Sequence, residues 1–211
     1  EYEQRLSNPQ DDVISALAHA DFAHPDLDEG ETRKLDFSEI YSIIQQLMVA
    51  GNETTTKFLD DTMRTLVEEP RWWNALDADP EGLIYGVVEE GLRISSPNQG
   101  LFRVVTRDAE IQGISIPKGS RVWVMFGAAN RDESTFGDSE AFDPTRDNLK
   151  EHIAFGKGHH FCIGAPLSRL EGKVAFEELV KRIKLPTFSE GNTFEYQSSF
   201  VLRGLAGLEL D

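Results

Sequence analysis

Residues 155–164 read Phe-Gly-Lys-Gly-His-His-Phe-Cys-Ile-Gly, and this stretch carries the strongest signal in the chain. Its three glycines allow tight turns and a close approach of the backbone to a flat, bulky group. Phe155 and Phe161 supply apolar cover, and a helix predicted to start just after Cys162 would favour a thiolate at its positive end. A thiolate in such a loop is a metal ligand or a nucleophile. The alternative is a small buried hydrophobic side chain, the usual role of a lone cysteine.

The composition sets broad limits on the kind of protein. The chain has 211 residues, of which 39% are hydrophobic, enough for a substantial core and one or two domains. A single cysteine excludes an internal disulfide framework and fits a reducing compartment, so we expect a cytoplasmic protein. There is no apolar run of about 18 residues, and the polar residues 1–5 resemble neither a signal nor a transit peptide. The net charge of -16 argues against nucleic acid and anionic membranes as partners.

The charge is unevenly distributed. Residues 150–184 contain seven Lys or Arg and four Asp or Glu, a local net charge of +3, so the remainder carries -19. This basic stretch has two interpretations. It is a docking surface for an acidic partner, or it reflects the preference of cations for a helix C-terminus, as at Lys181, Arg182 and Lys184.

The pattern of apolar residues predicts a mainly helical chain with small sheets. A short helix is expected over residues 12–20, and a long one from the capping box of Asp36 and Glu39 to just before Pro70. A further helix starts at Asp79-Pro80 and ends near residue 94, and another follows Cys162 to about residue 184. Strands are predicted at residues 101–105, 109–111, 114–116 and 121–125, residues 130–150 form a loop, and the tail resembles a hairpin around residues 204–207.

Residues 50–56, Ala-Gly-Asn-Glu-Thr-Thr-Thr, interrupt the predicted long helix. Glycine and threonine are weak helix formers, so this segment is locally inconsistent with its surroundings, as functional sites often are. An acid beside an alcohol is what a proton relay needs. The alternative is a tolerated polar patch that faces solvent.

Two other groups of residues could form an ion pair or bind a metal. Glu90 and Arg93 are spaced i, i+3 on the helix that starts at Asp79, which on its own indicates a surface ion pair. His152, His159, His160 and Cys162 could form a zinc site, although they lack the paired-ligand spacing of zinc fingers.

Together and in this order, these segments resemble the cytochrome P450 family. Phe155-x-x-Gly158-x-x-x-Cys162-x-Gly164 is similar to the haem-binding signature, and Glu90-x-x-Arg93 to the K-helix motif. Ala50–Thr55 resembles the oxygen-activation motif of the long I helix, and residues 142–146 with 152–155 resemble the meander before the cysteine loop. The resemblance implies a mainly α fold with small β-sheets, and the short loops are similar to those of the soluble bacterial branch.

The resemblance also implies roles for individual residues. Cys162 would be the axial thiolate of haem b, as is general for this family. The cofactor would also be held by a set of residues from three segments: Ala50, Arg103, Phe155, Gly156, His160 and Gly164. Glu53 and Thr54 would deliver protons to bound dioxygen. Glu90, Arg93 and Arg146 would form a buried supporting network. Pro97, Asn98, Leu101, Phe200 and Val201 would line the substrate pocket.

Members of the family are roughly twice as long as this chain. The resemblance therefore implies that residues 1–211 are the C-terminal, haem-binding part of a cytochrome P450 domain, comprising the I helix, K helix, meander, cysteine loop and L helix, without the N-terminal half. The expected function is insertion of one oxygen atom of O2 into a small apolar substrate. A ferredoxin or flavodoxin-type donor would supply the electrons, because no flavin or iron–sulfur motif is present. A haem-binding fragment without turnover and a zinc-binding protein are the alternatives.

Overall fold

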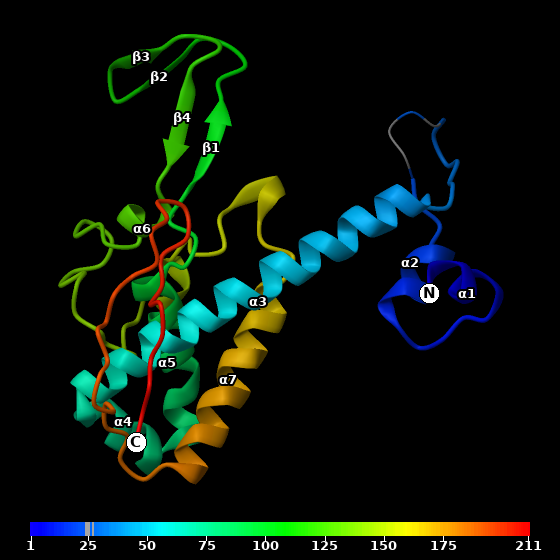
Figure 1. Cartoon of the computed structure of the whole chain (residues 1–211). Helices are drawn as coiled ribbons and strands as arrows, with labels where there is room; N and C mark the ends of the chain where they lie inside the picture. The colour runs from blue at the N-terminus through cyan, green and yellow to red at the C-terminus, as the bar shows by residue number, and fades with distance from the viewer. Residues whose placement is uncertain (24–25, 27) are drawn as a thin grey trace. The chain divides into compact units, whose positions relative to one another are not determined.

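The computed structural model describes residues 1–23, 26 and 28–211 and is built of helices with two small sheets (Figure 1). The predicted mainly α fold is therefore confirmed. The chain divides into two compact units, residues 1–52 and 53–211, which are described separately. None of the helices in the described part of the chain is long and apolar enough to cross a membrane.

The first unit contains α1 (Tyr2–Ser7), α2 (Val13–His19) and the first part of α3 (Phe37–Glu68). Two of these helices begin as the sequence predicts. The Asp12 side chain accepts a hydrogen bond from the Ser15 amide (2.7 Å) and caps α2. Asp36 and Glu39 form the capping box of α3, with reciprocal bonds of 2.9 Å each. The sequence did not predict α1, which is short and contributes no buried residue.

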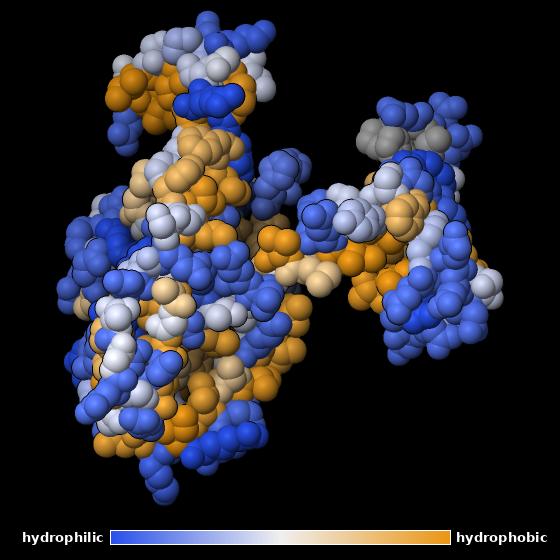
Figure 2. All heavy atoms as spheres, in the orientation of Figure 1, coloured by the Kyte–Doolittle hydropathy of each residue, from blue (hydrophilic) through white to orange (hydrophobic). Residues whose placement is uncertain are grey.

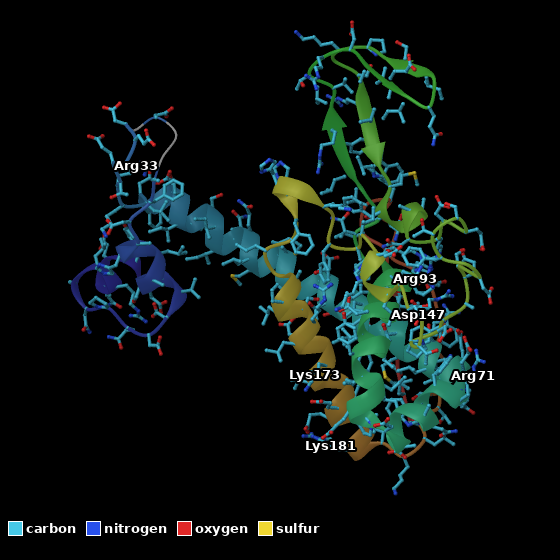
Figure 3. The ribbon with its side chains drawn as sticks, turned by 180° about the vertical axis from the view of Figure 1, so that it is seen from behind. Arg33, Arg71, Arg93, Asp147, Lys173 and Lys181 are labelled. Carbon is cyan, nitrogen blue, oxygen red and sulfur yellow. The ribbon has the colours of Figure 1, made fainter. Side chains whose placement is uncertain are left out.

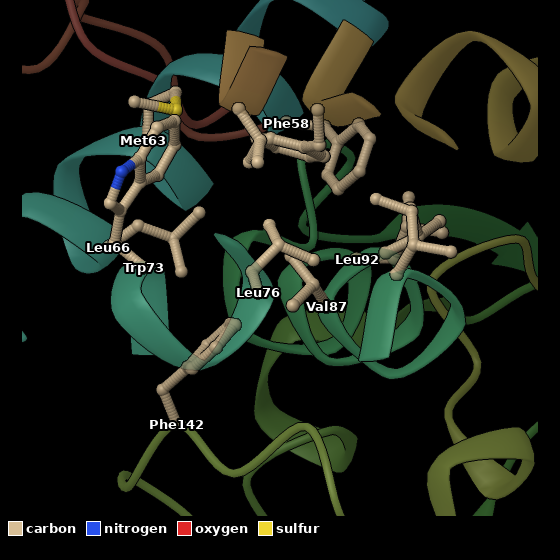
Figure 4. Packing of buried hydrophobic residues seen from close by; sticks show 12 residues of the cluster. Phe58, Met63, Leu66, Trp73, Leu76, Val87, Leu92 and Phe142 are labelled. Carbon is tan, nitrogen blue, oxygen red and sulfur yellow. The ribbon is translucent and has the colours of Figure 1, made fainter. Parts of the chain in front are cut away.

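The second unit is built from the rest of α3 with α4 (Pro70–Ala78), α5 (Pro80–Ser95), α6 (Phe126–Ala129) and α7 (Ala165–Arg182). Its core joins α3, α4, α5 and α7, and the packing is shown in Figure 4. Phe58, Trp73 and Phe176 are fully buried in this core. Large side chains of this kind contribute about 1.5–3 kcal/mol each when removed from water. The core therefore fixes the ends of α5 and α7 that carry the candidate site.

The sequence prediction omitted α4. Pro70 was interpreted only as the end of the long helix, and α3 does end at Glu68. However, proline is also favoured in the first turn of a helix, and Pro70 opens α4 after a break of one residue. The next helix, α5, begins as predicted, because the Asp79 side chain accepts a hydrogen bond from the Gly82 amide (3.0 Å).

The strands form two antiparallel pairs. β1 (Leu101–Val104) pairs with β4 (Arg121–Val124), with Leu101 opposite Val124, and β2 (Ala109–Ile111) pairs with β3 (Ile114–Ile116). Many of their apolar side chains are exposed, and Figure 2 shows apolar surface over these strands. The loop over residues 130–150 ends in a short 3-10 helix, η1 (Leu149–Glu151).

The tail differs from the predicted hairpin in two ways: the chain turns at another place, and the two arms are not regular strands. The two arms meet through single bridges, Tyr196 with Leu205 and Phe188 with Leu210, so the chain reverses near residue 200. Gly204 lies within one arm, where its carbonyl accepts a hydrogen bond from the Gln197 amide (3.0 Å). A Cβ built on Gly204 would collide with the side chain of Lys57, so this glycine serves close packing and not a turn.

Candidate functional site

The cysteine loop is held by glycines and by one backbone bond. Gly156 and Gly158 have φ angles of 69° and 78°, a region that L-residues with side chains rarely adopt. The short 3-10 helix η2 (Gly158–His160) follows, and the Cys162 amide donates to the Phe155 carbonyl (3.0 Å). α7 begins at Ala165, directly after the loop, as the sequence predicts. Cys162 therefore lies next to the N-terminus of an 18-residue helix.

The thiol of Cys162 is exposed, so its alternative role as a buried hydrophobic side chain is wrong. Apolar neighbours in the loop and in α7 are exposed with it: Phe161 by 51%, Ile163 by 92% and Leu167 by 57%. Isolated exposed apolar residues are common, but several beside one thiol form an apolar surface that a flat ligand would cover. A Cβ on Gly164 would lie 3.7 Å from the Cys162 sulfur, so the absence of a side chain there keeps the sulfur accessible.

The zinc alternative gains no support from the geometry. In the described part of the chain, no three His, Cys, Asp or Glu side chains are grouped so that they could hold a metal ion. The ring of His152 is buried and bonded to Glu89 (2.9 Å) instead of facing Cys162.

Glu90 and Arg93 form a fully buried pair on α5, so the surface ion pair indicated by their spacing is not what the structure contains. Arg93 Nη2 and Nε donate to the two carboxylate oxygens of Glu90 at 2.7 and 2.8 Å. Arg93 also donates to the carbonyls of Asn130, Ser139 and Ala141. Arg146 adds a bond to Glu90 (2.9 Å). The network thereby attaches the loop over residues 130–146 to α5 (Figure 3 labels Arg93).

Sequence reasoning missed a second buried network beside the first. Glu89 is fully buried and accepts from Arg169 Nε (2.5 Å) and from His152 Nε2 (2.9 Å). Burial alone would raise the pKa of Glu89, but the hydrogen bonds from His152 and Arg169 outweigh it and the pKa is lowered. The Arg169 guanidinium also lies over the ring of Phe155, 4.6 Å from its centroid. The sequence shows two adjacent acids, Glu89 and Glu90, but no local signal points to partners that lie 63 and 80 residues away along the chain.

The residues of the predicted proton relay lie on α3. Glu53 is exposed and pairs with Lys57 (3.1 Å), and Thr54 is half-buried. Both belong to the second unit, together with Cys162, whereas Ala50 belongs to the first unit and is exposed there. The next residue, Thr55, donates to Glu171 of α7 (3.0 Å), so this part of α3 is bonded to the helix that follows the cysteine loop.

The segments predicted to line the substrate pocket lie side by side. The Gln99 amide donates to the Val201 carbonyl (2.7 Å), and the Arg203 amide donates to the Pro97 carbonyl (2.8 Å). Asn98 forms a bridge with Leu202, while Leu101 and Phe200 are exposed. Arg103 and His160, two of the predicted cofactor-binding residues, are exposed on β1 and η2.

Most cations of the basic stretch are partnered within the chain. Arg169 binds Glu89, Lys173 binds Glu177 (2.7 Å), and Lys181 and Arg182 both bind Glu178. Lys173 and Lys181 lie along the α7 side of the second unit (Figure 3). Lys157 is exposed in the cysteine loop. Of these partners, Glu177 and Glu178 are already included in the net charge of +3, so only Glu89, which lies outside the stretch, reduces the local positive excess further.

Comparison with known proteins identifies the family. The sequence profile described as Cytochrome P450 matches residues 82–204. Erythromycin C-12 hydroxylase of Saccharopolyspora erythraea is 40% identical over 182 residues, which are 85% of this chain and 43% of that protein. The structure of cytochrome P450 CYP109Q5 from Chondromyces apiculatus is 40% identical, with a TM-score of 0.89 over 99% of this chain and 51% of that one. CYP109E1 from Bacillus megaterium in complex with testosterone is 35% identical, with a TM-score of 0.88 over 99% of this chain and 54% of that one.

The chain therefore belongs to the cytochrome P450 family, and it spans about half the length of the relatives that it matches. Members of this family bind haem through a cysteine thiolate. The residues present fit such a cofactor, because the exposed sulfur of Cys162 is bordered by exposed apolar side chains that a flat, apolar ring would cover.

Proposed function

We propose that this chain is the haem-binding part of a monooxygenase that inserts one oxygen atom of O2 into an apolar substrate. The overall reaction is RH + O2 + 2 electrons + 2 protons → ROH + H2O. The observation that carries the proposal is the exposed thiol of Cys162 in a glycine-turned loop with an apolar surround. Bound haem b would supply the iron at which dioxygen is activated.

The residues proposed to hold the cofactor in the second unit come from β1 and from the cysteine loop. Cys162 would bind the iron, and Phe155, Gly156 and Gly164 would shape the backbone and the apolar cover beside the sulfur. Arg103 and His160 would hold the propionates.

The proposed chemistry of the protein itself is proton delivery and support. Glu53 is exposed and can exchange protons with water, and Thr54 follows it directly, so the pair can pass protons from solvent toward the cofactor. Glu90, Arg93 and Arg146 would hold the loops that precede the cysteine segment. We place residues 1–211 in the C-terminal half of the family domain, and the cytoplasmic location predicted from the lone cysteine belongs to this proposal.

The substrate is proposed to be a small apolar molecule lying against Pro97, Asn98, Leu101, Phe200 and Val201. These residues come from two segments that are bonded to each other, and Leu101 and Phe200 expose apolar surface. The description of one relative supports this class, because that protein was solved in complex with testosterone.

The test is isotope labelling of the full-length holoprotein with ¹⁸O2 and a panel of steroids, terpenoids, fatty acids and polyketides. We expect one ¹⁸O atom in the hydroxylated product. Product oxygen drawn from water, or no oxygenation of any compound despite haem binding and reduction, would contradict the proposal and favour a haem-binding protein without turnover.

An electron donor is proposed to dock at the basic stretch of residues 150–184, as a ferredoxin or flavodoxin-type protein with an acidic surface. Replacing Lys157 and Lys173 together by glutamate should slow electron delivery at least about tenfold at low salt, because electrostatic steering accelerates association by 10–10³. The effect should shrink as salt increases, since the Debye length is only about 10 Å at 0.1 M.

The control for this prediction reverses two charges elsewhere. Arg107 and Lys118 are exposed cations outside the basic stretch, and replacing both by glutamate should leave donor-driven reduction unchanged. Turnover driven by hydrogen peroxide should be unaffected in both variants, because it needs no donor. Equal reduction rates in the two variants at all salt concentrations would mean that the basic stretch is only a solvated helix face.

A further inference from the structure

Lys57 is a buried cation on α3, one turn after Glu53. Only 3% of its side chain is exposed, whereas lysine is almost never buried unless it is paired. Its ammonium lies 3.1 Å from the Glu53 carboxylate and donates a short hydrogen bond to the side-chain oxygen of Gln197. Removing an ammonium group from water is unfavourable, and only well-placed partners offset this cost. The Glu53 carboxylate and the Gln197 side-chain oxygen are therefore the groups that stabilise the buried charge of Lys57.

The cover over Lys57 comes from the C-terminal arm, defined here as residues 195–206. Its two strands of chain are joined by bonds from the Gln197 amide to the Gly204 carbonyl (3.0 Å) and from the Ala206 amide to the Glu195 carbonyl (2.8 Å). Gly204 is buried and lies directly on the Lys57 side chain, where any Cβ would collide. The arm thus supplies both a polar partner and the space for the lysine.

The pair of Glu53 and Lys57 differs from an ordinary i, i+4 ion pair. Arg64 and Glu68, further along the same helix, are both partly exposed, by 27% and 45%. Exposed pairs of this type contribute little to stability, and salt screens them. The Lys57 charge has almost no access to water, so its attraction for the Glu53 carboxylate is screened far less.

We infer that Lys57 is a positioning residue for proton delivery, which fixes the carboxylate of Glu53 and is itself fixed by Gln197 of the C-terminal arm. The inference rests on the proposed function, since it assumes that Glu53 handles protons. Glu53 remains 45% exposed, so it can still exchange protons with water while its charged neighbour restricts where the carboxylate lies. The lysine itself transfers no proton to the substrate or the cofactor.

The same contacts connect proton delivery to the predicted substrate pocket. Phe200 and Val201 stand at the turn of the arm, three and four residues after Gln197. A bound molecule that displaces this turn would also move Gln197, because Gln197 lies only three residues before Phe200. We therefore expect substitutions of Gln197 to affect proton delivery through Lys57.

The first experiment measures product formed per pair of donor electrons in the full-length holoprotein. Lys57→Met keeps the apolar stem and removes the charge. We expect it to divert electrons to hydrogen peroxide and to lower the product yield about tenfold, a part of the 10²- to 10⁴-fold that positioned acid–base groups supply. Lys57→Arg should retain most of the yield. Combining Lys57→Met with Glu53→Gln should be no worse than either change alone.

The matched control is Asp60→Asn. Asp60 is a second carboxylate that interacts with Lys57, and burial raises its pKa, with Asp61 adding to the effect and Lys57 opposing it. If Lys57 acts through Glu53, removal of the Asp60 charge should leave the product yield unchanged. Turnover driven by hydrogen peroxide should be preserved in Lys57→Met, because the peroxide brings its own protons.

A second readout does not depend on turnover. Reductive methylation followed by mass spectrometry reports how accessible each lysine amine is. Lys57 should react at least about tenfold more slowly than the exposed Lys184, and Gln197→Ala should raise its reactivity if the arm holds the ammonium. The Asp60→Asn variant should leave Lys57 protected.

The outcomes separate this inference from the proposed function. If Glu53→Gln loses yield while Lys57→Met and Gln197→Ala keep it, the role of Lys57 is overturned and the proposed function stands. If Glu53→Gln forms as much product per electron pair as the wild-type protein, the proposed role of Glu53 is wrong, and the role of Lys57 is wrong with it. If Lys57→Met loses the haem spectrum, the decision falls to Lys57→Arg and Gln197→Ala, and full yield in Gln197→Ala with an unprotected Lys57 would contradict the inference.

Discussion

Replacement of Arg93 by alanine should lower the free energy of unfolding by about 3–5 kcal/mol, the cost of breaking a buried ion network by removing one partner. Arg93 is fully buried and donates to Glu90 and to three backbone carbonyls of the loop over residues 130–141. Without it, the carboxylate of Glu90 keeps only Arg146 as a charged partner, and the loop loses three of the hydrogen bonds that attach it to α5. Denaturant unfolding followed by circular dichroism measures the effect.

Arg71 provides the matched control. It also pairs with a nearby glutamate, Glu69 (2.6 Å), but its side chain is 67% exposed (Figure 3 labels both arginines). Arg71→Ala should change the stability by less than about 0.5 kcal/mol, as is usual for surface positions. A similar small change in Arg93→Ala would show that the buried network is not a major source of stability.

Replacement of Thr54 by alanine should leave substrate affinity within about twofold and divert most donor electrons to hydrogen peroxide. The reason is that a proton-delivering alcohol acts after the substrate is bound, so its loss affects the fate of reduced oxygen and not binding. Product yield per electron pair should fall at least about tenfold. Substrate titration and simultaneous measurement of donor consumption, peroxide and product test the prediction.

Thr56→Ala is the matched control for this change. Thr56 is exposed on the same helix two residues later, so its replacement should leave the product yield intact. A wild-type product yield per electron pair in Thr54→Ala would contradict the role of Thr54. The threonine cluster would then be a tolerated polar patch on α3.

Much of the fold was predictable because its signals are local. The starts of α2, α3 and α5 depend on aspartate side chains that cap the backbone within three residues, and the sequence shows them. The strand positions likewise follow from short β-favouring runs between glycine and proline turns. By contrast, α1 and α4 were missed, the first because it buries nothing and the second because Pro70 both follows one helix and opens the next.

What the sequence could not predict depends on partners distant along the chain. The resemblance supplied Glu90, Arg93 and Arg146, but not the adjacent network of Glu89, whose partners lie 63 and 80 residues away. Gly204 was interpreted as a turn residue. A glycine is required there because the Lys57 side chain, from near the opposite end of the second unit's sequence, leaves no space for a Cβ. Local patterns contain no information about such contacts, which only the assembled core brings together.

The account depends most directly on Cys162 as the thiolate ligand of haem iron. The absorption spectrum of the reduced, CO-bound, full-length protein tests this with no knowledge of the substrate. We predict a thiolate-type spectrum for the wild-type protein and its complete loss in Cys162→Ala, with the haem either released or ligated differently. An unchanged thiolate-type spectrum in Cys162→Ala, or a wild-type protein that binds zinc and no haem, would contradict the account.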